Sequence, residues 1–264
     1  MSEFQHPEAA ALVLAAGQGT RMKSDLPKVL HEVAQRPLLA YVLDAVEQLG
    51  TEHVWVVVGH QQEMVRAAFA DADVSWVEQV PQRGTGHAVM MAAPALATEG
   101  FDGTLLVLPG DTPLLTSKTL DWLLEGHRSI GAAATVLSMR LPDPTGYGRV
   151  IRQGDIVPRT PAPILRIVEH RDATPEERKI DEVNSAIYAF SYPALARVLS
   201  KLSTDNAQGE YYLTDAITLM NRAGLATAVV CAADYRELLG INTIEQLTEA
   251  ERTLRQLSAA RREP

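Results

Sequence analysis

Residues 10–31 read AALVLAAGQGTRMKSDLPKVLH, and this stretch decides how the 264-residue chain folds. Its first five residues are apolar, which predicts a buried strand. Gly17 and Gly19 follow directly, so the backbone can turn tightly and bring bare N–H groups close to a bulky anion. Arg21 and Lys28 add two positive charges to the same loop. A strand that runs into such a loop is suited to wrap a polyphosphate.

The glycine spacing separates this loop from two well-known phosphate-binding motifs. A dinucleotide fingerprint needs G-x-G-x-x-G, but Met22 stands where the third glycine would be. The P-loop string G-x-x-x-x-G-K-[ST] does not occur in the sequence. What is present is G-x-G-T-R-M, followed by Pro27, which restricts the backbone and gives Lys28 a defined direction. An ordinary glycine turn with two solvated cations is the alternative, and the full string disfavours it.

Composition narrows the class of protein. The length suits one large α/β domain or two small ones. A net charge of −9 argues against a general nucleic-acid or anionic-membrane binder, so phosphate recognition must be local. The single cysteine, Cys231, excludes an internal disulfide and is expected to be a packed strand thiol. Because the sequence has neither a long apolar stretch nor a signal peptide, we expect a reduced, soluble, cytoplasmic protein.

Strand-like and helix-like segments alternate through the first half of the chain. Expected strands cover 10–14, 53–58, 74–77, 104–108 and 132–139, and expected helices cover 38–49, 65–69, 86–93 and 117–127. The helix over 86–93 is expected to stop at Pro94, and Gly50 is expected to end the first helix. Alternation with short connections predicts an α/β fold with a doubly wound, mostly parallel sheet.

The second half of the chain changes character. Turn residues over 142–154 predict a hairpin or loop over the sheet, and three prolines over 158–163 predict an exposed excursion. We expect a strand over 183–190 and helices over 195–202, 213–223 and 243–258.

Ligands of an open parallel sheet bind outside the carboxyl ends of its strands. That rule selects the loop of residues 17–28 and also Pro109-Gly110-Asp111, which follows the strand over 104–108. Mg²⁺ takes oxygen ligands and bridges to phosphates through one or two protein groups, so Asp111 is a candidate metal ligand. The alternative for Asp111 is a cap of the following turn.

A second glycine turn covers residues 82–87 at an expected helix start. Gly84 allows close backbone approach, while Gln79 and Thr85 offer directional hydrogen bonds that suit a nucleobase edge. His87 is expected to be structural, because a lone histidine in a first helical turn more often is. Four later turns carry polar groups that could hold sugar hydroxyls or complete a Mg²⁺ shell, although each alone is no better than an ordinary turn: Gly148, Glu169, Asn184 and Asn242.

Taken together, these strings resemble the sugar-1-phosphate nucleotidyltransferases. The family motifs occur in family order over nearly the whole chain. They are L-A-A-G-x-G-T-R-M with S-D-L-P-K-V-L-H, then G-T-G-H-A, D-P-T-G-Y-G-R, V-E-H-x-D-A-T, N-A-Q-G-E-Y-Y-x-T-D and G-x-N. The resemblance is strongest to the N-terminal uridyltransferase (pyrophosphorylase) domain of the bifunctional bacterial enzymes that make UDP-N-acetylglucosamine for the cell wall. It implies a Rossmann-like nucleotidyltransferase fold.

The resemblance also implies roles for residues. The uridine nucleotide would be held by Leu14, Ala15, Ala16, Gly17, Gln79, Gly84 and Thr85, with Pro109 and Gly110 beside it. The catalytic cations on the phosphates would be Arg21 and Lys28, and the ligands of Mg²⁺ and substrate would be Asp111 and Asn242. The amino sugar would be held by Gly148, Glu169 and Asn184. It implies a single domain over 1–264, with a nucleotide-binding part at about 9–116, a small β-rich part facing the sugar at about 117–242 and a C-terminal helix at 243–264.

The implied reaction is transfer of UMP from UTP to N-acetyl-α-D-glucosamine 1-phosphate, with release of pyrophosphate. Two alternatives stay open: uridylyl or thymidylyl transfer to glucose 1-phosphate, and a non-catalytic nucleotide-sugar sensor. The implied partners are these small molecules, without nucleic acid or membrane. The sequence leaves the oligomeric state open.

The sequence departs from the family pattern in four places. Pro109 replaces a tyrosine, and Asn184-Ser185-Ala186 replaces N-T-G, which bears on sugar choice. The proline-rich stretch 158–163 is expected near the sugar side. The bifunctional enzymes continue into hexapeptide repeats, which this 264-residue sequence lacks, so we expect no acetyltransferase activity. The residues Tyr211, Tyr212 and Asp215 are expected to pack a helix start.

Overall fold

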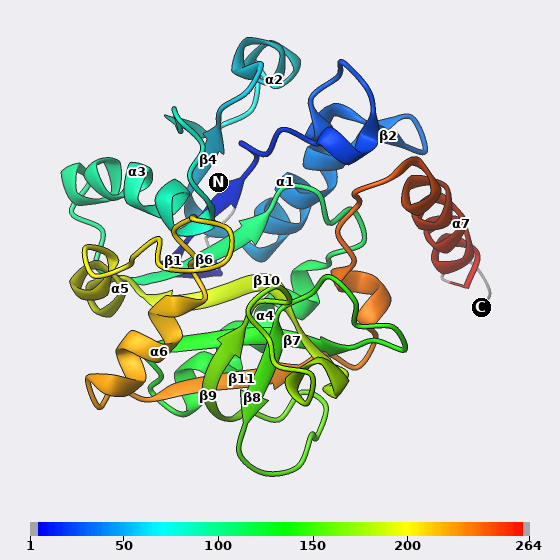
Figure 1. The fold of residues 1–264 in the computed structure, drawn as a ribbon. Coiled ribbons are helices and arrows are strands. Elements are labelled where there is room, and N and C mark those ends of the chain that lie inside the picture. Colours follow the sequence, from blue (N-terminus) through cyan, green and yellow to red (C-terminus); the bar gives the residue numbers. More distant parts are fainter. Residues whose placement is uncertain (1–4, 261–264) are drawn as a thin grey trace.

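The fold is built on one nine-stranded sheet. The computed structural model describes residues 5–260. The strand order is β5-β4-β1-β6-β10-β7-β11-β9-β8, and a separate pair, β2-β3, forms a small hairpin (Figure 1). The strands are β1 (His6–Leu14), β2 (Glu32–Val33), β3 (Arg36–Pro37), β4 (Thr51–Val58), β5 (Ser75–Glu78), β6 (Thr104–Pro109), β7 (Ala134–Arg140), β8 (Arg149–Arg152), β9 (Ala162–Val168), β10 (Glu182–Ser191) and β11 (Thr227–Cys231).

The sheet has a parallel half and a mixed half. Strands β5, β4, β1 and β6 run parallel, as do β7 and β11. Strand β10 lies antiparallel between β6 and β7, and β9 is antiparallel to both β11 and β8. The predicted α/β fold with strand–helix alternation is confirmed, and the antiparallel β10 is a feature that alternation alone did not predict.

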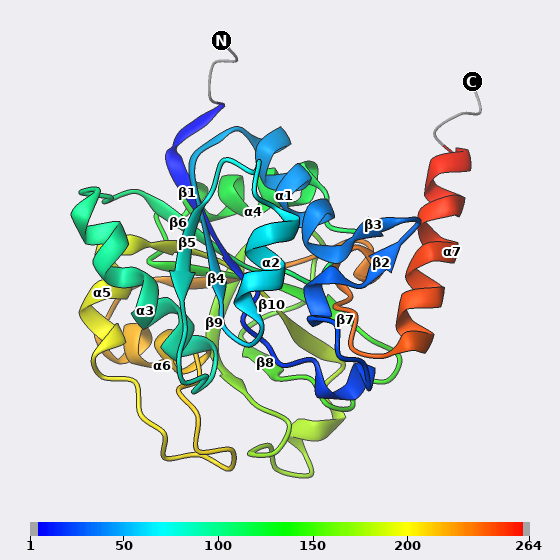
Figure 2. The ribbon, with the colours of Figure 1, turned by 90° about the horizontal axis from the view of Figure 1, so that it is seen from above.

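Helices cover both faces of the sheet (Figure 2). They are α1 (Leu38–Leu49), α2 (Gln62–Ala68), α3 (Thr85–Thr98), α4 (Ser117–Ser129), α5 (Tyr192–Leu199), α6 (Asp215–Arg222) and α7 (Ile244–Ala260), with short 3₁₀ turns at Thr20–Met22, Lys28–Leu30, Glu177–Lys179 and Tyr235–Leu238. None of the helices in the described range is both long and apolar enough to pass through a bilayer.

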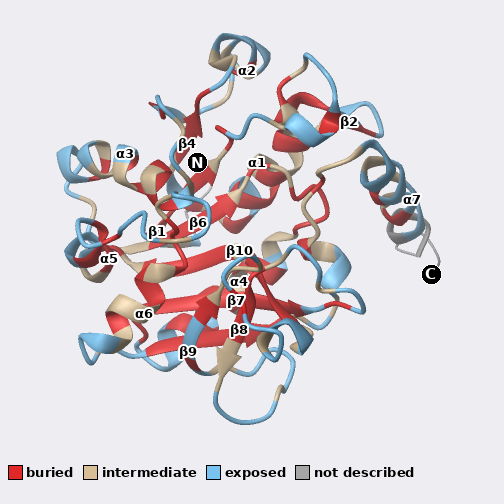
Figure 3. Ribbon diagram, viewed as in Figure 1, coloured by how far each residue is buried: buried red, intermediate tan, exposed pale blue. Residues whose placement is uncertain are grey.

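Side-chain alternation in β1 explains the two layers. Ala10 and Leu12 join the apolar cluster that includes residues of α3, α5 and α6, whereas Ala11 and Val13 join the cluster of α1 and α4. Successive strand residues point to opposite faces, so an all-apolar strand needs cover on both. Figure 3 shows the result, with buried strands in the centre and exposed loops around them.

One expectation about proline was wrong, and a second was confirmed only in part. Helix α3 does not stop at Pro94 but continues to Thr98. The fully buried Leu96 packs in the core beyond the proline, and this burial offsets the hydrogen bond that proline cannot donate. The stretch 158–163 starts as an exposed loop, but Ala162 and Pro163 enter β9 and pair with β11.

Candidate active site

The carboxyl ends of β1 and β6 lie side by side. Leu14 pairs with Pro109, and the N–H of Gly110 donates to the carbonyl of Leu14 at 2.9 Å. The loops that follow both strands therefore leave from the same edge of the sheet. They border a cleft of about 500 Å³, whose lining comprises Leu14, Ala15, Ala16, Gly17, Gln18, Gly19, Thr20, Lys28, Val29, Gln79, Gln82, Gly84, Thr85, Ala88, Pro109, Asp111, Ala186, Tyr188 and Glu210.

Gly19 directs Lys28 into this cleft. Gly19 has φ +63°, and a Cβ built on it would stand 2.7 Å from the Cβ of Lys28. Only glycine combines that backbone conformation with so close an approach. Among the described residues, none accepts a hydrogen bond from the backbone N–H groups of residues 17–20. The loop thus leaves backbone amide donors unpaired in a segment that lines the same cleft as the lysine.

Four side chains form an ionic cluster at one end of the cleft. The Lys28 ammonium forms an ion pair with Asp111 and donates to Oδ1 of Asn242 at 2.8 Å. Arg21 donates to the same Asn242 oxygen at 2.7 Å. Asn242 reaches the cluster because the N–H of Ile241 donates to the carbonyl of Asp111 at 2.9 Å. Residues more than 200 positions apart in the chain therefore meet at one point.

The oxygen atoms of this cluster fit a hard divalent cation. One carboxylate and one amide oxygen converge on the ammonium of Lys28, so both already face a cation. No group of three or more His, Cys, Asp or Glu side chains is placed to hold a metal within residues 5–260. Mg²⁺ does not need one, since it commonly binds one or two protein oxygens together with phosphate and water. Asp111 and Asn242 are the residues that would hold it.

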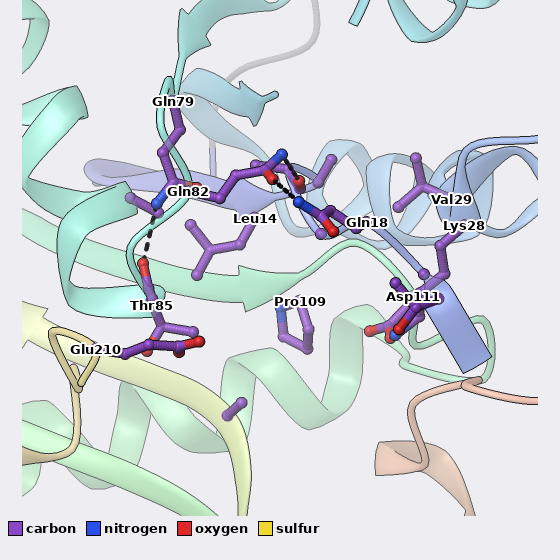
Figure 4. A pocket seen from close by; sticks show the side chains of 18 of the residues that line it. Leu14, Gln18, Lys28, Val29, Gln79, Gln82, Thr85, Pro109, Asp111 and Glu210 are labelled. Atoms are coloured by element: carbon purple, nitrogen blue, oxygen red, sulfur yellow. Dashed lines mark hydrogen bonds and ion pairs between the residues drawn. The ribbon is translucent and has the colours of Figure 1, made fainter. Parts of the chain in front are cut away.

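Away from the ionic cluster, amide side chains line the cleft from its middle towards its other end (Figure 4). Gln79 donates to the carbonyl of Gly84 at 3.0 Å, and Gln82 donates to the carbonyl of Ala16 at 2.6 Å. Gln18 in turn donates to Gln82 at 2.9 Å. Figure 4 shows Lys28 and Asp111 close together at one end, with Thr85 and Glu210 at the other. The cleft therefore carries the ionic cluster at one end, while amide groups, the Thr85 hydroxyl and the Glu210 carboxylate line the rest of it.

The turn before α3 packs closely against the segment that contains Tyr211. Gly84 has φ +96°, and a Cβ on it would stand 2.7 Å from the carbonyl oxygen of Tyr211. Gly86 donates its N–H to that same carbonyl at 2.8 Å. His87 contacts Gln79 at 3.2 Å and stacks on Tyr211, and burial, followed by the charge of Arg83, lowers the pKa of His87. These contacts are those of a structural histidine, as expected.

The three residues expected at the sugar lie together beside the cleft. The N–H of Asn184 donates to the carbonyl of Gly148 at 2.9 Å, and a Cβ on Gly148 would stand 3.3 Å from the Glu169 carboxylate. Thr214 donates to Glu169 at 3.1 Å. Burial raises the pKa of Glu169, and this effect exceeds the opposing effect of the Thr214 hydrogen bond. The carboxylate is thus held in a poorly solvated position.

Sequence reasoning missed several residues of the cleft. Gln18 stands between the two glycines of the first loop and Gln82 begins the second glycine turn, so their amide groups could have been a signal. Tyr188 gave no signal, because a tyrosine inside an apolar strand is typical of a core. Ala186 was noted only as a departure from the family glycine; its place in the cleft lies at an irregularity, where β10 shifts register between Asn184 and Ile187 and Ala186 adopts φ +64°.

The proline-rich stretch was expected near the sugar side, but it lies away from Glu169, one of the residues expected there. The guanidinium of Arg159 lies 3.6 Å from the ring centre of Trp122 in α4. Glu169 follows the opposite end of β9, and a seven-residue strand separates the two by roughly 20 Å. Tyr212, expected to pack, is buried and its hydroxyl donates to Asp172 at 3.3 Å.

Comparisons with known proteins agree on one family. The model of the MobA-like NTP transferase domain matches residues 11–170. The chain is 47% identical over 250 residues to the "Bifunctional protein GlmU" of Geobacter metallireducens, covering 94% of this chain and 51% of that protein. It is 48% identical to the protein of that name from Streptomyces griseus, over 93% of this chain and 50% of the relative. The chain thus spans about half the length of the curated relatives it matches.

Solved structures share the fold at low identity. A UDP-glucose pyrophosphorylase complexed with UDP-glucose superposes with a TM-score of 0.72 at 18% identity, covering 94% of this chain and 98% of that one. A UTP-bound UGPase from Acinetobacter baumannii gives 0.69 at 18% identity, covering 93% of each chain. At these identities the likeness establishes the fold.

Proposed function

Because the chain belongs to the MobA-like NTP transferase domain family, we propose that it transfers UMP from UTP to N-acetyl-α-D-glucosamine 1-phosphate, forming UDP-N-acetylglucosamine and pyrophosphate. One observation carries the proposal: Arg21, Lys28, Asp111 and Asn242 converge at the end of a cleft large enough for a nucleotide. Two cations and two oxygen ligands at one point suit the chemistry of a polyphosphate.

The nucleotide would lie along the cleft. Its triphosphate would lie against the free N–H groups of residues 17–20 and the two cations, and its base would lie against Gln79 and Thr85. An amide side chain both donates and accepts, so Gln79 can match a base edge that presents both kinds of group. Leu14, Ala15 and Ala16 would form the wall beside the base, with Pro109 next to them; Gly110 would hold this wall in place through its hydrogen bond to Leu14.

The residues would act by position and charge. A phosphate monoester is ionised at neutral pH, so its oxygen can attack the α-phosphorus of UTP in line with the departing pyrophosphate without a general base. Lys28 and Arg21 would stabilise the negative charge that develops on the bridging and leaving oxygens. A bound Mg²⁺, held by Asp111 and Asn242, would supply charge neutralisation at the phosphates.

Gly148, Glu169 and Asn184 support the choice of an N-acetylated amino sugar. They combine a backbone segment, a poorly solvated carboxylate and an amide within one small area. A carboxylate accepts hydrogen bonds from hydroxyls, and an amide can pair with an acetamido group. The 47% identity to bifunctional relatives over 94% of this chain supports the same substrate.

A pyrophosphate-release assay tests the proposal. Initial rates would be measured with UTP, dTTP, CTP and ATP, each with N-acetylglucosamine 1-phosphate and with glucose 1-phosphate, in Mg²⁺ and in EDTA. We expect the highest rate for UTP with the N-acetylated sugar and loss of the rate in EDTA. A higher kcat/KM for glucose 1-phosphate would assign the alternative substrate. UTP binding without pyrophosphate release from any pair would overturn the enzymatic proposal.

A further inference from the structure

Tyr188 lies between the nucleotide cleft and the candidate sugar residues. It belongs to β10, is 3% exposed and lines the cleft, and its ring stacks on Phe190 with centroids 5.4 Å apart. Its hydroxyl group reaches Asn184, four residues earlier, at 2.7 Å. The comparisons and the motifs give this tyrosine no role.

The direction of the Asn184–Tyr188 hydrogen bond follows from the backbone. The N–H of Ala186 donates to the side-chain oxygen of Asn184 at 3.0 Å. A backbone N–H can only donate, so the amide oxygen must face Ala186 and the amide nitrogen must face Tyr188. The Tyr188 oxygen is therefore an acceptor, and its proton points away from Asn184.

That proton is available to a ligand. Within residues 5–260, the Tyr188 hydroxyl donates to no protein acceptor, although the residue is almost wholly buried. Burial raises the pKa of Tyr188, and the nearby charge of Glu169 raises it further, so the hydroxyl keeps its proton at neutral pH. A buried donor left without a partner is unfavourable, and a substrate acceptor would satisfy it.

We propose that Tyr188 is a positioning residue for the sugar substrate, which fixes the side-chain amide of Asn184 and offers its own O–H to an acceptor oxygen of the sugar 1-phosphate. This inference rests on the proposed function and adds a determinant of its sugar specificity. With the amide held at both ends, Asn184 keeps one N–H and one lone pair for the ligand, in a fixed direction. An amide left to rotate would lose part of that preorganisation.

The substitution Tyr188→Phe tests the inference in the full chain. It removes one oxygen and leaves the ring against Phe190. With UTP saturating, we expect KM for N-acetylglucosamine 1-phosphate to rise about threefold to tenfold, which is what one neutral hydrogen bond contributes. We expect kcat to change less than about twofold and UTP affinity, measured by calorimetry, to be unchanged, since the substitution leaves the ionic cluster intact.

Tyr192→Phe is the matched control. Tyr192 lies in the same apolar cluster and its hydroxyl donates to the carbonyl of Ala93 at 3.2 Å, outside the cleft. We expect this variant to keep all kinetic parameters. A change in KM in both variants, or in neither, would overturn the role of Tyr188.

A double-mutant cycle with Asn184→Ala gives a second measurement that a general loss of stability would not mimic. We expect Tyr188→Phe to raise KM much less in the Asn184→Ala background, because the two side chains act as a unit. Full additivity would contradict the inference. Wild-type protein that turns over no sugar phosphate at all would instead refute the proposed function, whereas active wild type with an unchanged Tyr188→Phe variant refutes this inference alone.

Discussion

Two features require a glycine at position 19, its positive φ and its close approach to Lys28, and replacing Gly19 by alanine tests both. The substitution adds one methyl group and no charge. At φ +63°, an L-residue is disfavoured by about 1–2 kcal/mol, and the stiffer unfolded chain offsets roughly 0.4–1 kcal/mol of that. The new Cβ would also stand 2.7 Å from the Cβ of Lys28, and relieving such overpacking costs roughly 1–3 kcal/mol. We expect a loss of about 1–5 kcal/mol in the free energy of unfolding.

Two other glycines provide matched controls for the Gly19→Ala substitution. Gly100 has φ +66° but open space around its Cβ position, so Gly100→Ala carries only the backbone penalty. Gly17 has open space and no positive φ, so Gly17→Ala carries neither penalty for stability. Urea unfolding of the three variants should therefore rank them Gly19→Ala as least stable, then Gly100→Ala, then Gly17→Ala.

Activity adds a second readout for Gly19→Ala. If Lys28 must move to relieve the contact, turnover at saturating UTP should fall on the order of 100-fold, the scale seen for misplacement of about 1 Å. Gly100 lies after α3, away from the cleft, so turnover of Gly100→Ala should be unchanged. Gly19→Ala with stability equal to Gly100→Ala and turnover within threefold of wild type would refute the reasoning that Gly19 directs the lysine.

Three further substitutions test other parts of the site. Lys28→Ala should lower turnover by about 100- to 1,000-fold, and near-normal turnover in the pyrophosphate assay would remove the mechanism. Ala186→Gly should raise the free energy of unfolding by up to about 1 kcal/mol, because it relieves φ +64° at Ala186; a loss in urea unfolding would contradict this. Glu169→Gln should stabilise the fold at neutral pH but weaken sugar binding. Burial raises the pKa of Glu169, so the folded wild type loses stability as pH rises through that pKa. The stability gained by Glu169→Gln, followed by thermal unfolding across pH, should therefore grow with pH, and a pH-independent difference would refute this.

The first half of the fold could be predicted from local signals. Gly50, at φ +74°, ends α1 where the sequence analysis placed the end, and the predicted α/β alternation is confirmed. The resemblance to nucleotidyltransferases is confirmed as well, by the family match over residues 11–170 and by the 47% identity. The end of a helix, the alternation of strands and helices and the family motifs can all be recognised from short stretches of sequence, and a single glycine can mark a helix end.

What the sequence could not predict depends on long-range packing. Pro94 was expected to end the helix because a proline inside a helix is locally destabilising. The burial of Leu96 stabilises the continued helix through contacts with distant parts of the chain, and no local pattern contains this information. The antiparallel course of β10 and its irregularity at Ala186 likewise follow from pairing with β6 and β7. Tyr188 lines the cleft although it stands inside an apolar strand, and such a strand pattern is equally typical of a core residue.

The ionic cluster explains how a chain with net charge −9 can present a site for polyphosphate. Arg21 and Lys28 donate to the same oxygen of Asn242, so two like charges are held close together. Two unit charges about 5 Å apart repel by roughly 3 kcal/mol at an effective dielectric constant near 20. Asp111 supplies only one compensating negative charge through its ion pair with Lys28. The site therefore keeps a local excess of positive charge, and because a triphosphate would neutralise that excess, the repulsion present in the free protein favours binding of the anion.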